Sequence, residues 1–477
     1  MDHYKNQELT VTIEDMSDNG EGIGRSDGYI LFVKDALPGD TVRAGLTKVK
    51  KNYAYARCKE IVTPSPDRSE PVCPRHKRCG GCQIQALSYD AQLKFKENKV
   101  RNDLMRIGGI DADVLDKAFE PMIGMDDPLR YRNKSQYPVG TDKDKKPVAG
   151  FYAGRTHSII PCTDCMLAPE ENSRILEVIL SHMEKHGISA YDETTGSGCI
   201  RHVLIRKGFA TGQIMVCLVI KTDKSGRKQK DDKGTYIQGQ DELIEELSKI
   251  KGMTSICVSI NNENTNVIMG NEIHTLWGED TINDILLGKR FSISPLSFYQ
   301  VNPIMVEKLY STAIQYADLC GKEEVWDICC GIGTISLCMA DKAKTVHGLE
   351  IVPEAIDDAK KNATANNVKN ANFICAAAEE YLPAHKDEIT ADVIVLDPPR
   401  KGMDEAALAV IADTAPSRIV YVSCDSATLA RDLKYLTGRG YEVQRIRCHD
   451  MFPHTVHTET VVCLKHIEEE KGNAPEK

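Results

Sequence analysis

Residues 323–340, "EEVWDICCGIGTISLCMA", decide the fold of the C-terminal part of the chain, because they read as a buried strand, a glycine-rich turn and a helix. The same plan recurs at 345–367, "TVHGLEIVPEAIDDAKKNATANN", and two more apolar strands follow in "ADVIVLDPPRKG" (391–402) and "RIVYVSCD" (418–425). Apolar strands without alternation, each followed by a helix, are typical of a parallel sheet that is covered on both faces. We therefore predict an α/β domain over residues 291–477.

The rest of the chain predicts two further domains. Residues 7–62 hold short strand-like runs between turns such as "SDNGEGIGRSDG" and "ALPGD", a pattern typical of a small OB-like β-barrel. The proline-rich stretch "TPSPDRSEP" (63–71) follows as a linker. The middle region mixes helix and strand patterns that do not settle a topology. The predicted domains are residues 1–65, a barrel; residues 66–290, a central α/β domain; and residues 291–477, the α/β domain described above.

Composition indicates an ordinary soluble protein of a reducing compartment. The chain has 477 residues, 41% of them hydrophobic and 27% charged. It has no apolar run of about 18 residues, and "MDHYKNQELT" at the start lacks the pattern of a secretory signal. The 17 cysteines are an odd number scattered over a long chain, which argues against a secreted disulfide framework. We therefore expect a cytoplasmic protein with no membrane partner.

The net charge of −10 hides three basic windows. Residues 61–110, 129–160 and 201–233 carry excesses of four, five and six positive charges. Such windows can hold the phosphate backbone of a nucleic acid, or they can be solvated faces with no partner.

The residues after the first two predicted strands indicate a cofactor site. Ligands of open parallel sheets bind beyond the carboxyl ends of the strands, where Gly331 and Gly333 let the backbone pass close to a ligand. Glu350, about 20 residues further on, stands where an acid binds the hydroxyls of a ribose. This pair fits NAD or S-adenosylmethionine. The turn lacks the third glycine of a dinucleotide site, so it suits S-adenosylmethionine better.

Three polar residues follow the later strands. "DPPRKG" (397–402) is a rigid turn that holds Asp397 and Arg400 at the cleft, where the acid can accept from an amine and Arg400 can meet a carbonyl or phosphate of the substrate. Cys424 stands directly after the strand "IVYV" (419–422). A cysteine at such a place is either core filling or a nucleophile.

A second group of cysteines indicates a metal centre. "CPRHKRCGGC" places Cys73, Cys79 and Cys82 in one glycine-containing loop, and "HSIIPCTDCML" (157–167) offers Cys162 or Cys165 as a fourth ligand. By spacing alone, four cysteines bind zinc as well as an iron–sulfur cluster.

Six motifs in one order resemble the RNA uracil-C5 methyltransferase family, in particular its 23S ribosomal RNA branch. The motifs are "SFYQVNP" (297–303), "DICCGIGT" (327–334), "GLEIVPEAI" (348–356), "DPPRKG" (397–402), "YVSCDSATLARD" (421–432) and "FPHTVHTETV" (452–461). The barrel is similar to the TRAM domain of that branch, and the cysteine loop is similar to its iron–sulfur site. The resemblance implies a Rossmann-like catalytic domain that uses S-adenosylmethionine, a 4Fe-4S cluster, and methylation of a uridine in 23S ribosomal RNA.

The resemblance also implies roles for single residues. In this chemistry a thiolate adds to C6 of uracil, C5 becomes electron-rich, and a base later removes the C5 proton. Cys424 matches the nucleophile and Glu459 the base, with His454 and His457 as rivals for the second role. The family's cofactor contacts correspond to Gln300, Glu350 and Asp397. Its cluster ligands correspond to Cys73, Cys79, Cys82 and Cys165, since the fourth ligand lies eight residues after a histidine like His157.

Two departures from the family pattern concern this site. Cys329 stands where an aromatic residue usually forms one wall of the cofactor site. Asp425 and Ser426 replace the usual "NP" after the nucleophile, and an acid beside Cys424 disfavours the thiolate unless its side chain points away. A transfer-RNA uracil methyltransferase and a non-catalytic RNA-binding protein with a vestigial methyltransferase domain are the alternatives. We expect a monomer.

Overall fold

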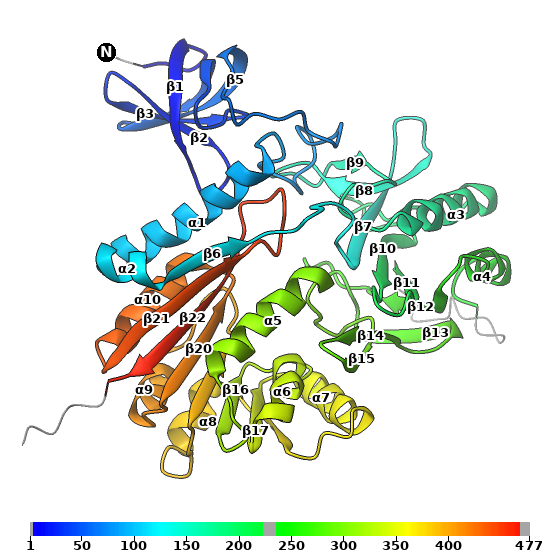
Figure 1. Cartoon of the computed structure of the whole chain (residues 1–477). Coiled ribbons are helices and arrows are strands. Elements are labelled where there is room, and N and C mark those ends of the chain that lie inside the picture. Colours follow the sequence, from blue (N-terminus) through cyan, green and yellow to red (C-terminus); the bar gives the residue numbers. More distant parts are fainter. Residues whose placement is uncertain (1–2, 223–234, 468–477) are drawn as a thin grey trace, which may run out of the picture.

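The computed structural model describes residues 3–222 and 235–467, and it has three parts (Figure 1). The N-terminal part is a closed barrel with the strand order β1-β2-β3-β5-β4. Its strands are β1 (Glu8–Met16), β2 (Gly22–Ser26), β3 (Tyr29–Lys34), β4 (Thr41–Val49) and β5 (Tyr53–Thr63). Alternate side chains such as Val11 and Ile13 fill its interior, because successive residues of a strand face opposite sides. The predicted barrel is confirmed.

The C-terminal part is an eight-stranded sheet with the order β18-β17-β16-β19-β20-β22-β21-β6. Its strands are β16 (Glu324–Ile328), β17 (Thr345–Glu350), β18 (Ala371–Cys375), β19 (Val393–Leu396), β20 (Arg418–Ser423), β21 (Tyr441–His449), β22 (Glu459–His466) and β6 (Phe119–Ile123). The five strands from β18 to β20 run parallel, and β22 runs antiparallel to both of its neighbours. The predicted α/β class is confirmed.

Helices cover both faces of this sheet. One face packs against α5 (Pro303–Ala317), α6 (Thr334–Met339), the 3₁₀ turn Ala340–Lys342 and α7 (Pro353–Ala365). The other face packs against α8 (Ala378–Ala384), α9 (Glu405–Asp413), α10 (Ser426–Thr437), α1 (Tyr89–Arg106) and α2 (Ala112–Ala118). Neighbouring residues of one strand serve opposite faces: Val325 belongs to the first core and Trp326 to the second.

Helices α1 and α2 and the edge strand β6 come from the segment that we assigned to the central domain. Strand β6 pairs in parallel with β21, and α1 packs beside α10. Residues far apart in sequence are thereby joined in one core, which includes Leu104 of α1 and Leu429 of α10.

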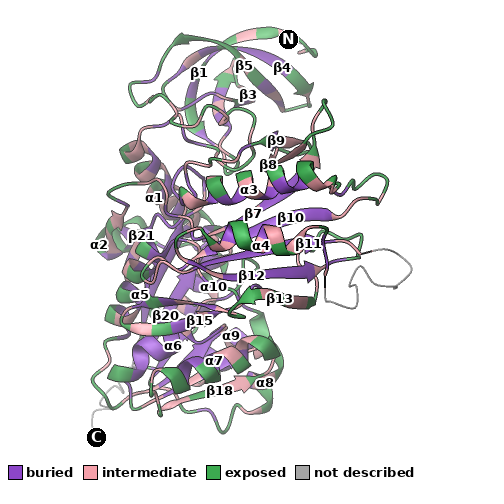
Figure 2. Cartoon of the chain, turned by 90° about the vertical axis from the view of Figure 1, so that its right-hand side faces the viewer, coloured by how far each residue is buried: buried purple, intermediate pink, exposed green. Residues whose placement is uncertain are grey.

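The central part is a seven-stranded sheet with the order β13-β12-β11-β10-β7-β8-β9, beside the two-stranded sheet β14-β15. Its strands are β7 (Lys134–Thr141), β8 (Pro147–Tyr152), β9 (Ile159–Pro161), β10 (Ile200–Lys207), β11 (Ile214–Ile220), β12 (Met253–Ile260), β13 (Glu272–Gly278), β14 (Ile282–Leu286) and β15 (Lys289–Ile293). Helices α3 (Glu171–His186) and α4 (Gln240–Ser248) lie on one face with their buried sides toward the strands (Figure 2). Part of the third basic window, residues 223–234, lies outside the described residues. No helix in the described ranges has the length and apolar character that spanning a membrane requires.

Candidate active site and cysteine cluster

The residues predicted to act in catalysis meet at the end of the eight-stranded sheet where its parallel strands have their carboxyl ends. Strand β16 has β17 on one side and β19 on the other, so the chain order reverses here and opens a crevice beyond the carboxyl ends. Asp397 directly follows β19, and Cys424 directly follows β20. Glu459 is the first residue of β22, which runs antiparallel to β20 with Thr460 paired to Ser423. This antiparallel strand brings Glu459 to the same end of the sheet as the other two.

Electrostatics couple these three side chains. Cys424 is half-buried, and burial together with the charges of Glu459 and Asp397 raises the pKa of its thiol to about 12, against the opposing effect of Arg400. Burial raises the pKa of Asp397 to about 7, with a further contribution from Asp327. Glu459 is only 3% exposed, and burial followed by the charge of Asp397 raises its pKa well above the ordinary value. The site therefore holds one carboxyl group, that of Asp397, which exchanges its proton near neutral pH, and a second, that of Glu459, whose burial favours the protonated form, beside a thiol that needs a base.

Asp425 does not act as a free acid beside Cys424. Its carboxylate caps helix α10 and accepts hydrogen bonds from the amides of Ala427 (3.1 Å) and Thr428 (3.0 Å). Next to it, the hydroxyl of Ser426 donates to Asp103 of α1 at 2.5 Å. Asp425 and Ser426 thus fix the start of the helix that follows Cys424.

Helix α1 holds the segment that leads to Glu459. The buried ammonium of Lys96 donates to Asp450 Oδ1 (2.5 Å) and to the carbonyl of Phe452 (3.0 Å). The hydroxyl of Tyr89 donates to Asp450 Oδ2 at 2.8 Å. Gln92 accepts from the backbone amide of His454 at 2.9 Å. These contacts fix the segment 450–454 against α1.

The two histidines that rival Glu459 have other surroundings. The Nδ1 atom of His454 lies 3.3 Å from the side-chain amide of Gln92, and its carbonyl accepts from the amides of Gln83 and Ile84 in the cysteine loop. His457 is half-buried, and burial followed by the charge of Arg400 lowers the pKa of its imidazole. His454 therefore joins two loops, whereas the charge of Glu459 acts on the Cys424 thiol.

The turn after β16 fits an adenosine with a free ribose. The amides of Gly331 and Val352 donate to the two carboxylate oxygens of Glu350 at 3.1 and 3.0 Å. Gly331 has φ +55°, and a Cβ built on it would meet no atom within 4 Å, so the space above the turn is open. Beside Glu350, the apolar side chain of Ile351 is 60% exposed, which suits the face of an adenine. Cys329, with φ +69°, packs against the core under α8 and α9, in the place of the usual aromatic wall.

Gln300 lies in the segment before α5. It is half-buried, and its carbonyl accepts from the side-chain amide of Asn133 at 2.9 Å. Asn302, two residues later, caps α5 by accepting from the amide of Met305 at 3.2 Å, and its own amide donates to the carbonyl of Met451 at 3.1 Å. Gln300 is thereby tied both to the central sheet and to the segment before Glu459.

Comparison with known proteins agrees with this geometry. Residues 288–467 match the model of the tRNA (Uracil-5-)-methyltransferase family, and residues 2–59 match the TRAM domain. An uncharacterized RNA methyltransferase of Listeria innocua is 46% identical over 461 residues, which cover 96% of this chain and 98% of the relative. One of Clostridium tetani is 44% identical, with 98% of each chain covered.

A solved structure extends the likeness to three dimensions. The Pyrococcus abyssi tRNA (uracil-54, C5)-methyltransferase, in complex with S-adenosyl-L-homocysteine, superposes with a TM-score of 0.72 at 26% identity, covering 96% of this chain and 100% of that one. The chain belongs to the RNA uracil-5 methyltransferase family. The resemblance inferred from the six motifs is confirmed, and the chain is an RNA methyltransferase rather than a binding protein with a vestigial domain.

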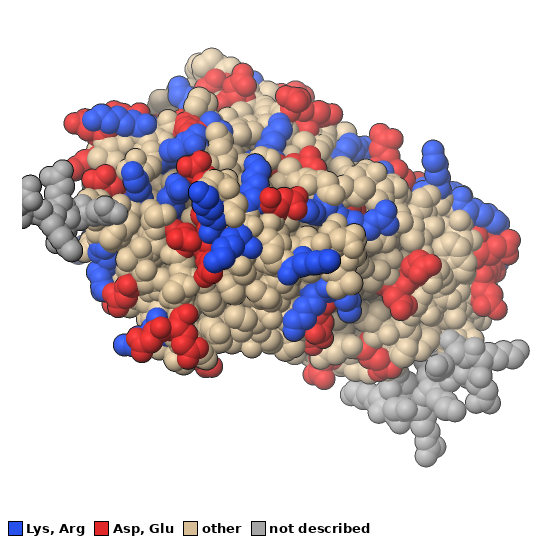
Figure 3. Space-filling model, turned by 60° about the horizontal axis from the view of Figure 1, so that its bottom comes forward, with Lys and Arg blue, Asp and Glu red and all other residues tan. Residues whose placement is uncertain are grey.

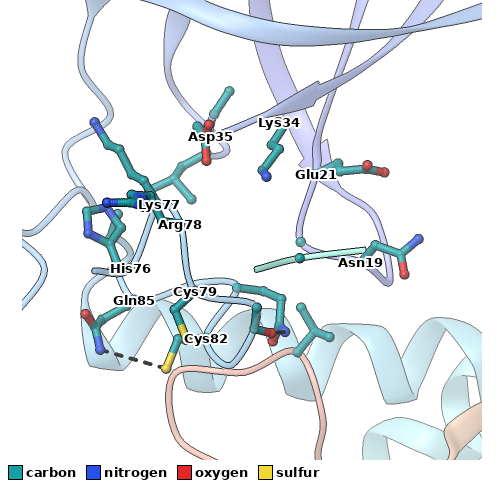
Figure 4. Close-up of a pocket in the computed structure, with 18 of the residues that line it drawn as sticks. Asn19, Glu21, Lys34, Asp35, His76, Lys77, Arg78, Cys79, Cys82 and Gln85 are labelled. Atoms are coloured by element: carbon teal, nitrogen blue, oxygen red, sulfur yellow. Dashed lines mark hydrogen bonds between the residues drawn. The ribbon is translucent and has the colours of Figure 1, made fainter. Parts of the chain in front are cut away.

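The four predicted cluster ligands of this methyltransferase come from two loops that lie side by side. Cys79 bridges to Ala153, and Gly80 donates to the carbonyl of Tyr152 at 3.1 Å, so the cysteine loop rests on the end of β8. The backbone N–H of Gly81 donates to Cys79 Sγ at 3.4 Å. The side-chain amide of Gln85 donates to Cys82 Sγ at 4.0 Å, a contact drawn as the dashed line in Figure 4. Burial, and to a smaller extent the charges of the other ligand cysteines, raises the pKa values of Cys79, Cys82 and Cys165.

The two candidates for the fourth ligand differ in their hydrogen bonds. The backbone amides of Leu167 and Ala168 lower the pKa of the Cys165 thiol against the larger raising effect of burial, whereas the thiol of Cys162 donates to the carbonyl of Asp164 at 3.3 Å. Amides that donate to sulfur stabilise a thiolate ligand. His157, the family's marker for this ligand, pairs instead with Glu193 at 2.6 Å.

A cavity of about 380 Å³ joins the barrel, the cysteine loop and the segment before Glu459 (Figure 4). Its walls include Lys34 of β3, Lys77 and Arg78 beside the cysteines, and His457. In the described part of the chain, neither Lys34, Lys77 nor Arg78 forms an ion pair. Sequence reasoning missed this cavity, because its walls come from three segments that are distant in sequence.

Proposed function

We propose that this methyltransferase methylates C5 of a specific uridine in 23S ribosomal RNA through a covalent bond between Cys424 and C6 of the base. The observation that carries the proposal is that Cys424, Asp397 and Glu459 meet at the carboxyl ends of the strands. The turn of Gly331 after β16 and Glu350 at the end of β17 lie at the same end of the sheet. Flipping the uridine out of an RNA loop brings the base to this end of the sheet.

The residues of the chain divide the chemistry between them. The Cys424 thiol passes its proton to the Asp397 carboxylate as its sulfur bonds to C6, while the electron pair of the C5–C6 double bond moves toward C5 and the ring carbonyl. S-adenosylmethionine, when bound, supplies the electrophilic methyl group, and Glu350, Gly331, Cys329 and Gln300 are the residues that would hold it. Glu459 then takes the proton from C5, the double bond re-forms, and the sulfur of Cys424 leaves C6. Arg400 faces this site and offers its guanidinium to a uracil carbonyl or to the adjacent phosphate.

We further propose that Cys73, Cys79, Cys82 and Cys165 hold a 4Fe-4S cluster with a structural role close to the RNA. N–H groups donate to the sulfurs of Cys79 and Cys82, which suits ligands of an iron–sulfur cluster. By spacing alone four cysteines would bind zinc as well, so the family resemblance is what favours the cluster. Methyl transfer moves no net electrons, which is why the proposed role is not redox.

Basic side chains support an RNA substrate. Lys34, Lys77 and Arg78 line the cavity beside the cysteines, and a volume of about 380 Å³ is large enough for a nucleotide. The face shown in Figure 3 differs from this cavity, because Lys and Arg are interspersed there with Asp and Glu and no continuous basic patch forms.

A transfer-RNA substrate is the second candidate, favoured by the name of the superposed Pyrococcus abyssi enzyme. The barrel together with the cysteine loop supports the ribosomal substrate. Mapping of 5-methyluridine in ribosomal and transfer RNA, from cells with and without the gene, decides between them. Loss of the modification from 23S ribosomal RNA is the expected result, and loss only from transfer RNA would contradict the ribosomal assignment.

Trapping of the covalent bond tests the mechanism. RNA with 5-fluorouridine, incubated with the protein and S-adenosylmethionine, should give a stable protein–RNA adduct, because Glu459 cannot remove fluorine as a cation. The variant Cys424→Ala should form none. The matched control Cys320→Ala, at an exposed thiol after α5, should form as much as the wild type. An adduct with Cys424→Ala would show that another residue is the nucleophile.

A further inference from the structure

Two cations face each other across neighbouring strands of the central sheet. Lys134 on β7 pairs directly with Arg206 on the antiparallel strand β10, so their side chains lie on the same face. Arg132 is close to both, because its Nε donates to the carbonyl of Lys134 at 3.0 Å and its charge acts on the Lys134 ammonium. Like charges placed directly opposite one another in a sheet are destabilising unless something compensates them.

Carboxylates do not compensate these charges. Within residues 3–222 and 235–467, none of Arg132, Lys134 and Arg206 has a carboxylate oxygen within 4.0 Å. Arg206 is only 3% exposed; its Nη2 donates to the carbonyls of Pro295 (3.3 Å) and Ser297 (2.5 Å), and its Nε has no partner. Burial, followed by the charges of Arg206 and Arg132, lowers the pKa of the Lys134 ammonium to about 8. A half-buried group of cations without an acid lacks a counter-ion.

The cations lie where the three functional segments meet. Asn133, between Arg132 and Lys134, donates from its side chain to the carbonyl of Gln300 and from its backbone to that of Val301. Tyr131 donates to the carbonyl of Pro453 in the segment before Glu459 at 3.2 Å. Arg132 is also close enough to the cysteine loop that its charge acts on the Cys82 thiol. The group therefore adjoins the cofactor segment, the catalytic segment and the cysteine cluster.

We propose that Arg132, Lys134 and Arg206 form an anion site that binds a backbone phosphate of the RNA next to the flipped uridine. This inference rests on the proposed function and adds the residues that position its substrate. A phosphate would relieve the repulsion between Lys134 and Arg206. Arg132 would offer a planar pair of donors and Lys134 a compact charge, while Arg206 stays anchored to the segment 295–297 and contributes its field.

The carboxylate of S-adenosylmethionine is another anion near Gln300, and the test separates it from RNA. The variant Lys134→Gln removes one charge and keeps a polar side chain of similar length. The matched control is Lys143→Gln, at an exposed lysine in the turn between β7 and β8 of the same hairpin. Affinity for a fluorescent transcript that the wild type methylates is measured against salt, and affinity for S-adenosyl-L-homocysteine is measured on the same preparations.

We expect Lys134→Gln to weaken RNA binding about tenfold at moderate salt and to reduce the slope of log affinity against log salt by about one. The control should match the wild type in both, and all three proteins should bind S-adenosyl-L-homocysteine equally. An unchanged slope overturns the inference, and so does a loss of S-adenosyl-L-homocysteine affinity without a loss of RNA affinity.

A second measurement uses the wild type and needs no variant to fold. An amine-acylating reagent at low dose should modify Lys134 faster than Lys143, and the transcript should protect Lys134 selectively, as measured by mass spectrometry of peptides. Equal protection of both lysines overturns the anion site. Because both measurements use a transcript on which wild-type methylation has been demonstrated, their failure counts against this site alone. Absence of wild-type methylation on any RNA would instead defeat the proposed function, and the inference with it.

Discussion

The Nζ atom of Lys96 lies 2.5 Å from Oδ1 of Asp450, and neither side chain is exposed to solvent. Lys96 belongs to α1, which follows the cysteine loop, whereas Asp450 begins the segment that leads to Glu459. This buried ion pair therefore fastens the catalytic segment to a helix some 350 residues earlier in the chain. Ser426, which donates to Asp103 of the same helix, fastens the start of α10 beside Cys424 in the same way.

Removing the cation of this pair should destabilise the protein. Lys96→Met leaves the carboxylate of Asp450 buried without its counter-charge, so we expect the free energy of unfolding to fall by about 3–5 kcal/mol. Urea denaturation followed by circular dichroism measures the change. The double variant Lys96→Met with Asp450→Asn should recover part of the loss, because no uncompensated charge remains and Tyr89 keeps an acceptor. A double variant as unstable as the single one would contradict this explanation.

The raised pKa of Asp397 predicts how stability depends on pH. Burial raises the pKa to about 7 in the folded chain, against about 3.9 for an unfolded aspartate. The folded state therefore binds this proton more tightly than the unfolded state does. The resulting contribution to the free energy of unfolding is fully present below about pH 4 and is lost as the pH rises through 7. Asp397→Asn should flatten this part of the profile and, allowing for partial access to water, gain about 1–2 kcal/mol at pH 8.

Denaturation midpoints between pH 4 and pH 8 check this prediction, with the exposed Asp387→Asn as control. The control should follow the wild type at every pH. Some slope should remain in Asp397→Asn, since burial also raises the pKa of Asp327, to about 6. Methyl transfer should fall in the stabilised variant if Asp397 serves the site. A variant that is fully active and no more stable than the wild type would show that the buried Asp397 carboxylate neither lowers stability nor takes part in methyl transfer.

Asp425 should act as a helix cap and not through its charge on the thiol. Asp425→Asn keeps an acceptor for the amides of Ala427 and Thr428, so we expect an unchanged stability, whereas Asp425→Ala should lose about 1 kcal/mol. The pH dependence of Cys424 alkylation measures the effect on the thiol. A midpoint that drops by more than about half a pH unit in Asp425→Asn would show that the acid suppresses the thiolate directly.

The proposed cluster should be lost when a ligand cysteine is replaced by serine and should persist when Cys162 is replaced. Cys79→Ser removes a proposed ligand, so the purified variant should lose the brown colour of the cluster, most of its roughly four irons per chain and much of its RNA affinity or solubility. Cys162→Ser, the matched control one loop away, should keep all of these. Iron and zinc analysis with visible spectra decides the outcome. One zinc and no colour in the wild type would replace the cluster by a zinc site, and loss of iron from Cys162→Ser would exchange the fourth ligand.

Local patterns in the sequence were enough to predict the barrel, the parallel sheet and the turn of Gly331 and Glu350. Each depends on residues close in the chain: apolar runs of strand length, glycines at a tight turn, and an acid at the end of the next strand. Cys424 was recognised in the same way, since it directly follows an apolar strand. Its identification as a nucleophile needed the motif around it, because a cysteine after a buried strand is equally suited to core packing.

Other features depend on pairings between distant segments. Nothing local in "FEPMI" (119–123) indicates that it forms the edge of the C-terminal sheet as β6, because that pairing is made with β21 over 300 residues later. The register of β10 against β7 alone decides that Arg206 faces Lys134, and one residue of slip would turn them to opposite faces. The sequence by itself thus determined which chemical groups the protein has and which local elements carry them. Only the tertiary structure decided which of these groups meet, because strand register and helix packing depend on how residues from distant segments are buried together.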